Sequence, residues 1–576
     1  MRTTYEPVNY AARRARFIAG SCLTMSLLLL AGCGGGGSTP TGTGGSPPPS
    51  TSPPPGTAPP PGTAPPPGTG ATVNVLTYHN DNARDGLNDQ ETVLTHANVN
   101  STDFGKIGFY SVDGKVDAQP LYVSALAING GTHNVLYVAT EHDSVYAFNA
   151  DNGNVLWQVS LLDSGETPGD NRNCNQVTPE IGVTATPVID PGAGPHGTIY
   201  VTATSRDANG NYFQRLHALD LATGAELSGS PVTVQAQYPG TGDNSSGGYV
   251  IFHPSQYKER PGLLLQNGTV YTFWSSHCDH RPYTGWIIAY DQQTLARTAV
   301  LDITPNGNEA SIWASGAGPA ADTSGNIYLL AANGTFETTL DANGFPVNQD
   351  YGNAFLKLST AGNSLAVADY FNMYNTISES NVDEDLGSGG ALVLPDFTDA
   401  NGTVRHLAVG AGKDQNIYVV NRDNMGKFNP NNNDALYQEL PNGLGGGEFG
   451  MPAYFNDTVY YGAVGDVIRA FTISQALLST TPSSQTANAF VYPGTTPGIS
   501  ANGTANGIVW AVENSNPAVL YAYDAGNLAN ELYDSNQAGT RDQFGPGNKF
   551  ITPTIANGKV YVGTTDGVAV FGLLPQ

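Results

Sequence analysis

One pattern recurs from about residue 104 to the C-terminus: an apolar stretch with small residues, a turn, a Val- and Tyr-rich strand, a tight turn and a second strand. The clearest copy, residues 135–157, reads VLYVATEHDSVYAFNADNGNVLW. Further copies, roughly 50 to 80 residues apart, begin at Thr198, Thr269, Asn326, His406, Thr458, Gly507 and Lys559. This period, with several strands in each copy, is typical of a β-propeller.

An inner strand precedes each of these eight strand pairs. The inner strands are predicted to begin near Gln119, Thr184, Gly262, Gly316, Ala391, Gly450, Gly498 and Thr552. The last copy has no outer strand of its own, and FGKIGFYSV at residues 104–112 precedes the first inner strand. We expect that segment to complete the last blade, because closure removes exposed strand edges. The predicted fold is all-β, a single eight-bladed propeller over residues 104–576.

Six tyrosines occupy the same position in the copies. They are Tyr137, Tyr200, Tyr271, Tyr328, Tyr460 and Tyr561. Because they fall on strands, we interpret them as packing residues between blades. A platform for carbohydrate is the alternative that this position disfavours.

Composition narrows the classes of protein and partner. Charged residues make up only 12% of the chain, whereas 70 residues are glycine, which disfavours coiled coils and long exposed helices and suits short strands joined by turns. The formal net charge is −26. A surface this acidic repels a phosphate backbone, so no nucleic-acid partner is expected.

The N-terminal region predicts export. Residues 1–32 combine an Arg-containing start with an apolar run, as in a signal peptide, and Leu30-Ala31-Gly32-Cys33 resembles a bacterial lipobox, in which Cys33 would be lipidated. The alternative is a buried signal cysteine with another cleavage site. Residues 33–72 form a Pro/Gly/Thr-rich linker predicted to be disordered, and residues 73–103 form a lead-in segment. The expected location is the outer membrane, on its periplasmic or outer surface, with the lipid as the only membrane contact.

The segment AFNADNGNVLW at residues 147–157 resembles the repeat of pyrroloquinoline-quinone (PQQ) propellers, in which a glycine turn is followed by tryptophan. The chain is therefore similar to quinoprotein alcohol dehydrogenases, a superfamily that also has cofactor-free members such as the lipoprotein of outer-membrane barrel assembly. The resemblance implies an eight-bladed fold and, for the enzymes, PQQ with calcium. Those alcohol dehydrogenases commonly carry two adjacent cysteines near the quinone, which this sequence lacks. Fold alone does not carry the activity.

Propeller connectivity places the long insertions on one face, here called the looped face. The insertions are residues 163–183, 235–260, 276–285, 333–352, 372–387 and 430–448. Functional loops on a rigid scaffold make this face the candidate site. In keeping with the resemblance, Glu180, Asp383, Asp385 and Glu448 are candidate oxygen ligands for a calcium-bound cofactor; ordinary solvated loop carboxylates are the alternative.

Two interpretations apply to Ser276-His277-Cys278-Asp279-His280. His277, Asp279 and His280 could bind a metal through imidazole and carboxylate groups. Alternatively, Cys278 forms a disulfide with Cys174, the other cysteine beyond residue 33, since an exported protein meets oxidising conditions and both lie on the looped face.

Two functions follow from these features. The first is a lipid-anchored binding or assembly scaffold whose looped face takes a protein, a glycan or a small molecule. The second is a PQQ- and calcium-dependent dehydrogenase that oxidises an alcohol or a sugar. The fold, the tether and the loops suffice for the first function, so binding is the preferred prediction.

Overall fold

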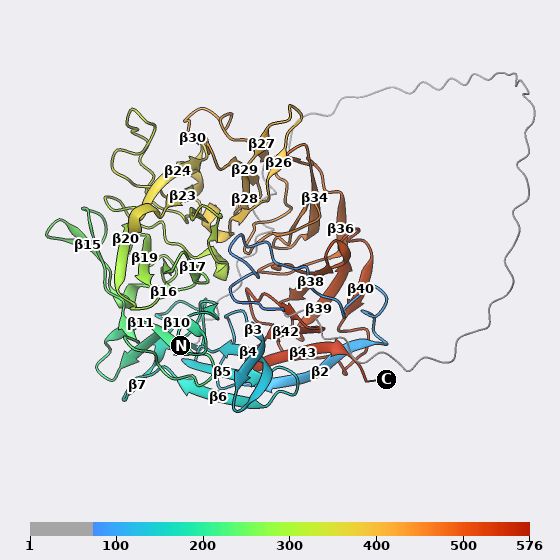
Figure 1. The fold of residues 1–576 in the computed structure, drawn as a ribbon. Coiled ribbons are helices and arrows are strands. Elements are labelled where there is room, and N and C mark those ends of the chain that lie inside the picture. Colours follow the sequence, from blue (N-terminus) through green and yellow to red (C-terminus); the bar gives the residue numbers. More distant parts are fainter. Residues whose placement is uncertain (1–72, 576) are drawn as a thin grey trace, which may run out of the picture. The chain divides into compact units, whose positions relative to one another are not determined.

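The computed structural model describes residues 73–575, in which eight antiparallel sheets surround a common axis (Figure 1). The predicted all-β, eight-bladed propeller is confirmed. The predicted signal peptide, Cys33 and the linker lie outside the described residues. Within residues 73–575, no helix is long and apolar enough to cross a membrane.

Each blade is given from its inner to its outer strand. Blade 1 contains β3 (Leu121–Ile128), β4 (Gly131–Ala139), β5 (Ser144–Asn149) and β6 (Val155–Ser160). Blade 2 contains β9 (Val188–Asp190), β10 (Thr198–Asp207), β11 (Tyr212–Asp220) and β12 (Val232–Thr233). Blade 3 contains β17 (Leu264–Gln266), β18 (Thr269–Ser275), β19 (Trp286–Asp291) and β20 (Arg297–Asp302). Blade 4 contains β21 (Ala320–Ala321), β22 (Ile327–Leu330), β23 (Phe355–Ser359) and β24 (Ala366–Asn372).

The second half of the ring repeats this order. Blade 5 contains β25 (Leu392–Val393), β28 (Leu407–Ala411), β29 (Ile417–Asn421) and β31 (Gln438–Leu440). Blade 6 contains β32 (Ala453–Phe455), β33 (Thr458–Tyr461), β34 (Val467–Ser474) and β36 (Ser484–Ala489). Blade 7 contains β37 (Gly498–Asn502), β38 (Ala505–Glu513), β39 (Val519–Asp524) and β40 (Glu531–Asp534). Blade 8 contains β41 (Thr554–Ala556), β42 (Lys559–Gly563), β43 (Gly567–Leu573) and β2 (Phe104–Ser111).

The remaining elements are short. They are β1 (Leu87–Asn88), β7 (Glu166–Asp170), β8 (Glu180–Ile181), β13 (Gln237–Pro239), β14 (Ser245–Ser246), β15 (Tyr249–Ile251), β16 (Lys258–Glu259), β26 (Phe397–Thr398), β27 (Val404–Arg405), β30 (Lys427–Phe428), β35 (Leu477–Leu478), α1 (Thr376–Ser380) and the 3₁₀ turns Pro254–Gln256, Ala314–Gly316, Ala361–Asn363 and Leu386–Ser388. β1 lies in the lead-in segment, and the others lie in connections within or between blades.

Strand β2 closes the ring, as predicted for residues 104–112. It pairs antiparallel with β43, so the two ends of the propeller share blade 8. Phe104 at the start of β2 is fully buried, with ring centroids 5.4 Å from Trp510, 5.0 Å from Tyr533 and 6.4 Å from Phe571. Burial of an aromatic ring in such a cluster makes this strand an integral part of the core.

The repeated tyrosines link neighbouring blades through hydrogen bonds. The Tyr137 hydroxyl donates to the Leu221 carbonyl (2.8 Å) and the Tyr200 hydroxyl to the Gln292 carbonyl (2.8 Å), each in the next blade. Tyr460 donates in the same way to Ala525 (2.8 Å). The acceptor follows the third strand of the next blade each time, so the repeat contains its own inter-blade contact. The packing interpretation is confirmed for these three tyrosines.

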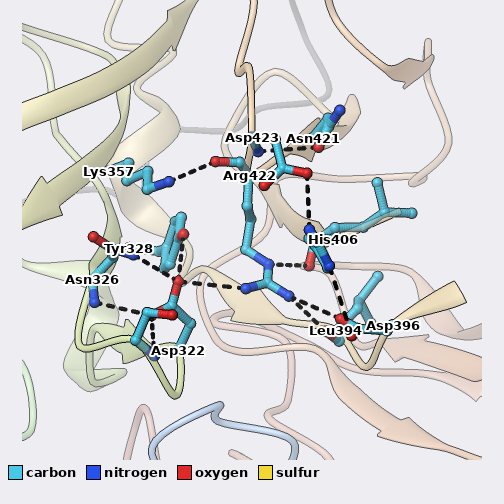
Figure 2. A network of polar contacts seen from close by, with 12 residues as sticks. Asp322, Asn326, Tyr328, Lys357, Leu394, Asp396, His406, Asn421, Arg422 and Asp423 are labelled. Atoms are coloured by element: carbon cyan, nitrogen blue, oxygen red, sulfur yellow. Dashed lines mark hydrogen bonds and ion pairs between the residues drawn. The ribbon is translucent and has the colours of Figure 1, made fainter. Parts of the chain in front are cut away.

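Blades 4 and 5 are joined instead by Arg422 (Figure 2). Its guanidinium lies 3.5 Å from the Asp322 carboxylate, 3.6 Å from the Asp396 carboxylate and 3.1 Å from the Leu407 carbonyl oxygen. Tyr328 donates its hydroxyl to the same Asp322 (2.9 Å). The tyrosine position of blade 4 therefore acts through an ion pair rather than through a carbonyl of the next blade.

The lead-in segment is threaded along the inner strands, a feature that the sequence did not indicate (dark blue in Figure 1). It forms hydrogen bonds of 2.6–3.1 Å with all eight blades, in their order along the chain. The pairs are Val75–Tyr122, Leu76–Ile189, Asn82–Leu265, Asn82–Ala321, Ala83–Val393, Asp85–Tyr454, Gly86–Ile499 and Asn88–Ile555. The inner strands thus pair with this segment at the axis instead of exposing their free edges.

Arg84 anchors the lead-in segment. Its guanidinium is fully buried and donates to the carbonyl oxygens of Tyr78 (2.7 Å), Leu263 (3.1 Å) and Pro319 (2.9 Å). Burial lowers the pKa of Arg84 to about 10. A guanidinium that satisfies carbonyls from separate blades holds those blades at a common centre.

Candidate functional site

The insertions gather on the looped face largely as predicted. They precede an inner strand or join the second and third strands of a blade. The range 430–448 is the exception, because the outer strand β31 lies inside it and only the part after Leu440 leads to the looped face. The predicted disulfide is confirmed: Cys174 and Cys278 are bonded, with Cα atoms 5.6 Å apart, and connect the insertions of blades 2 and 3.

Three of the four carboxylates proposed as calcium ligands already have a cationic or imidazole partner. Asp383 and Asp385 meet on Lys413, whose ammonium lies 2.7 Å and 2.6 Å from them. Although burial opposes its charge, these two aspartates raise the pKa of Lys413. Glu180 lies elsewhere, 2.9 Å from His142 Nδ1. Two of the four candidates are therefore brought together, and a lysine occupies the position between them.

Glu448 is isolated from the other candidates. It is buried, and neither carboxylate oxygen has a hydrogen-bond partner. Burial, and then the charge of Asp466, raises its pKa to about 8. Burial in these surroundings favours the neutral form of this carboxyl at neutral pH.

The two histidines of the 276–280 loop lie in different environments. His277 is buried, whereas Asp279 and His280 are exposed. Asp279 accepts hydrogen bonds from the hydroxyls of Ser276 (3.1 Å) and Tyr283 (2.9 Å). No group of three His, Cys, Asp or Glu side chains within residues 73–575 is placed to hold a metal ion. The metal site at these residues stays a prediction that this arrangement does not support.

Four aromatic side chains form an arc at the ends of the looped-face connections, here called the aromatic arc: Trp313, Phe449, Tyr492 and Phe550. Successive ring centroids lie 6.0, 5.6 and 6.2 Å apart, with interplanar angles of 68°, 72° and 79°. Tyr492 is 44% exposed and the other three are half-buried. Each precedes the inner strand of a different blade, which is why residues far apart in sequence converge here.

Cations flank both ends of the aromatic arc. Lys413 lies 5.8 Å from the Trp313 ring centroid and 6.0 Å from that of Phe449. At the other end, Arg260 lies 4.8 Å and Lys549 lies 5.9 Å from the Phe550 centroid. Such cation–π contacts fix the rings and keep positive charge beside their faces.

A second group, here called the cation cluster, consists of Lys115, Lys258, Arg260 and Lys549 around Asp117. The Asp117 carboxylate lies 3.1 Å from the Lys115 ammonium and 3.7 Å from the Arg260 guanidinium. Burial alone would raise the pKa of Asp117, but these cations hold it below its usual range. Burial lowers the pKa of Lys258 to about 7 and that of Lys549 to about 8, with neighbouring cations contributing.

The sequence interpretation missed both groups. Their residues share no motif, and each lies in a different connection. One signal was present: Trp313, Phe449, Tyr492 and Phe550 each stand four to seven residues before an inner strand. Aligning the connections that follow the outer strands, rather than the strands alone, would have revealed this recurrence.

Comparisons with known proteins establish the fold. No protein-family model matches the sequence, and no curated protein matches it. Among solved structures, quinohemoprotein alcohol dehydrogenase from Comamonas testosteroni is similar, with a TM-score of 0.57 and 15% identity over 87% of this chain and 82% of that one. A europium-containing methanol dehydrogenase has a TM-score of 0.54 and 12% identity over 87% of this chain and 98% of that one. The likeness to propellers of this kind is thus confirmed for the fold.

Proposed function

We propose that this protein is a binding scaffold, anchored through a lipid on Cys33, whose ligand lies against the aromatic arc. The observation that carries this proposal is the arc itself. Four loops from four blades bring aromatic rings to one place while leaving them partly exposed. Exposed aromatic groups of this kind are enriched at binding surfaces, because a rigid ring offers a large contact area at little entropic cost.

The ligand that fits the arc best is a glycan or another ring-bearing small molecule. A cavity of about 10 Å³, enough for one water molecule, lies between Phe449 and Phe550. A ligand would therefore rest across the rings, with its polar groups reaching the cations at both ends.

The alternative is a PQQ- and calcium-dependent dehydrogenase, favoured by the fold likeness. The donor set does not fit the calcium that the resemblance implies, because Lys413 lies between Asp383 and Asp385 and Glu180 pairs with His142. Within residues 73–575, the two cysteines are bonded to each other across two insertions. We therefore derive no catalytic step through the quinone.

The test is a glycan array probed with the full-length protein and two matched variants. Tyr492→Ala removes a ring of the arc that is 44% exposed, and Tyr249→Ala removes one on the peripheral strand β15 that is 42% exposed. We expect bound glycans to lose at least about tenfold in signal with Tyr492→Ala, on the order of 1.4 kcal/mol, and to keep it with Tyr249→Ala.

Equal loss in both variants would contradict binding at the arc. A parallel arm adds PQQ with and without calcium and follows dye-linked oxidation of ethanol and glucose. Saturable PQQ binding with turnover that Glu180→Gln abolishes would replace the scaffold proposal with the dehydrogenase.

A further inference from the structure

The cation cluster carries more positive charge than the protein around it balances. Lys115 and Arg260 pair with the Asp117 carboxylate, and Lys258 and Lys549 lie near Arg260. The other carboxyls near the cluster are Glu141 and, beside Lys258, Asp279. Burial, and then the charge of Asp117, raises the pKa of Glu141 well above its usual value. Lys258, with a pKa of about 7, is only partly charged at neutral pH and has Asp279 as a neighbour. Lys115, Arg260 and Lys549 still outnumber Asp117.

This imbalance is unusual for the chain. The formal net charge is −26, with only 23 lysines and arginines in 576 residues. Four of them nevertheless converge where the connections into blades 1, 3 and 8 meet. Partly buried cations are costly unless an anion is present, so the cluster is suited to an anionic group supplied from outside.

The cation cluster contacts the aromatic arc at Phe550. Arg260 and Lys549 both lie beside its ring, and its other neighbour is Tyr492 at 6.2 Å. No two successive rings of the arc are parallel, since their planes meet at 68–79°. A flat polycyclic ligand cannot stack between two adjacent rings, because their planes are not parallel. A puckered sugar ring can contact two rings that are inclined to each other.

We propose that this site takes an anionic sugar, a saturated sugar ring bearing a carboxylate or a phosphate, with the ring on Phe550 and Tyr492 and the anion on Lys549 and Lys115. This inference rests on the proposed function and names its ligand class. Lys549 is partly exposed and so can meet a ligand, and the Lys115 side chain beside Asp117 is 11% exposed. Arg260 is buried, 4.8 Å from the Phe550 ring centroid.

The experiment is isothermal titration calorimetry of the full-length protein at low ionic strength with glucuronate, glucose 6-phosphate and glucose. We expect at least one of the two anions to bind at least about tenfold more tightly than glucose, and this preference to decline as salt screens the charges. Binding of glucuronate alone identifies a carboxylate site, and binding of glucose 6-phosphate alone a phosphate site.

Two lysine variants distinguish binding at the cation cluster from nonspecific attraction of an anion to lysines elsewhere. Lys549→Gln is expected to weaken binding of the anionic sugar about tenfold. Lys106→Gln, on the outer strand β2, removes the same charge away from the axis and should leave affinity unchanged. Equal affinities for glucose and both anions, or equal loss in both variants, would overturn the inference. If neutral glycans alone bind and depend on Tyr492, the proposed function stands and only the anionic ligand fails.

Discussion

Glu448 illustrates how a single side chain can couple the propeller to pH. Its carboxyl is buried without hydrogen-bond partners, and its pKa in the folded protein is about 8, above the ordinary glutamate value of 4.5. The folded state therefore prefers the protonated form. The corresponding stability is fully present below about pH 4.5 and is lost as the pH rises through about 8.

Glu448→Gln should remove this dependence, because glutamine cannot ionise. The melting temperature of the variant minus that of the unaltered protein should increase steadily between pH 5 and pH 8. The corresponding difference in the free energy of unfolding is up to about 1.4 kcal/mol for each pH unit. Thermal unfolding followed by circular dichroism at several pH values measures this. Glu384→Gln, at an exposed residue of a looped-face insertion, is the control and should show no trend. A flat difference for Glu448→Gln would mean that this carboxyl is solvated in solution.

At the scale of elements, strand β2 decides whether the ring is closed. Phe104→Ala removes a fully buried ring between Trp510, Tyr533 and Phe571 and is expected to lower the free energy of unfolding by about 3–5 kcal/mol. Phe109→Ala, on the same strand but 37% exposed, should cost less than about 1 kcal/mol. Urea unfolding of both variants makes the comparison. If Phe104→Ala lowered the free energy of unfolding as little as Phe109→Ala, the closing strand would lie outside the cooperative core.

Periodicity predicted the elements well because each blade repeats the same local chemistry. The eight inner strands, the closing strand and the inter-blade tyrosines all follow from positions within one repeat. The site did not follow, because its contacts cross between repeats. Lys413 of blade 5 lies beside Trp313 and Phe449, which come from the connections into blades 4 and 6. Trp313 and Phe550 likewise come from connections into different blades of the closed ring. Such contacts leave no local pattern in the sequence.

The lead-in segment escaped prediction for a related reason. Its partners are main-chain groups of eight separate blades, and hydrogen bonds to the main chain impose little on the sequence of the partner strands. Arg84 alone gave an indication, as the single lysine or arginine of residues 73–103. Only the closed ring shows that its donors satisfy carbonyl oxygens at the axis.

For the whole molecule, the proposed anchor predicts where the propeller resides. Cys33→Ser removes the acceptor of the lipid, and the propeller should then move from the membrane pellet to the soluble fraction of cell extracts. Cys174→Ser is the control, because it removes a cysteine of the looped face and leaves the anchor intact. Membrane association that persists in Cys33→Ser would refute lipid anchoring at this residue.

The threaded lead-in segment also sets the order in which this chain can mature. Synthesis proceeds from the N-terminus, so residues 75–88 emerge before any blade, yet their last partners, Ile499 and Ile555, emerge near the end. The outer strand β2 likewise waits for β43. Long-range pairing of this kind is slow to form. An incomplete chain thus holds a strand and a central segment without their final partners until its last blade is made.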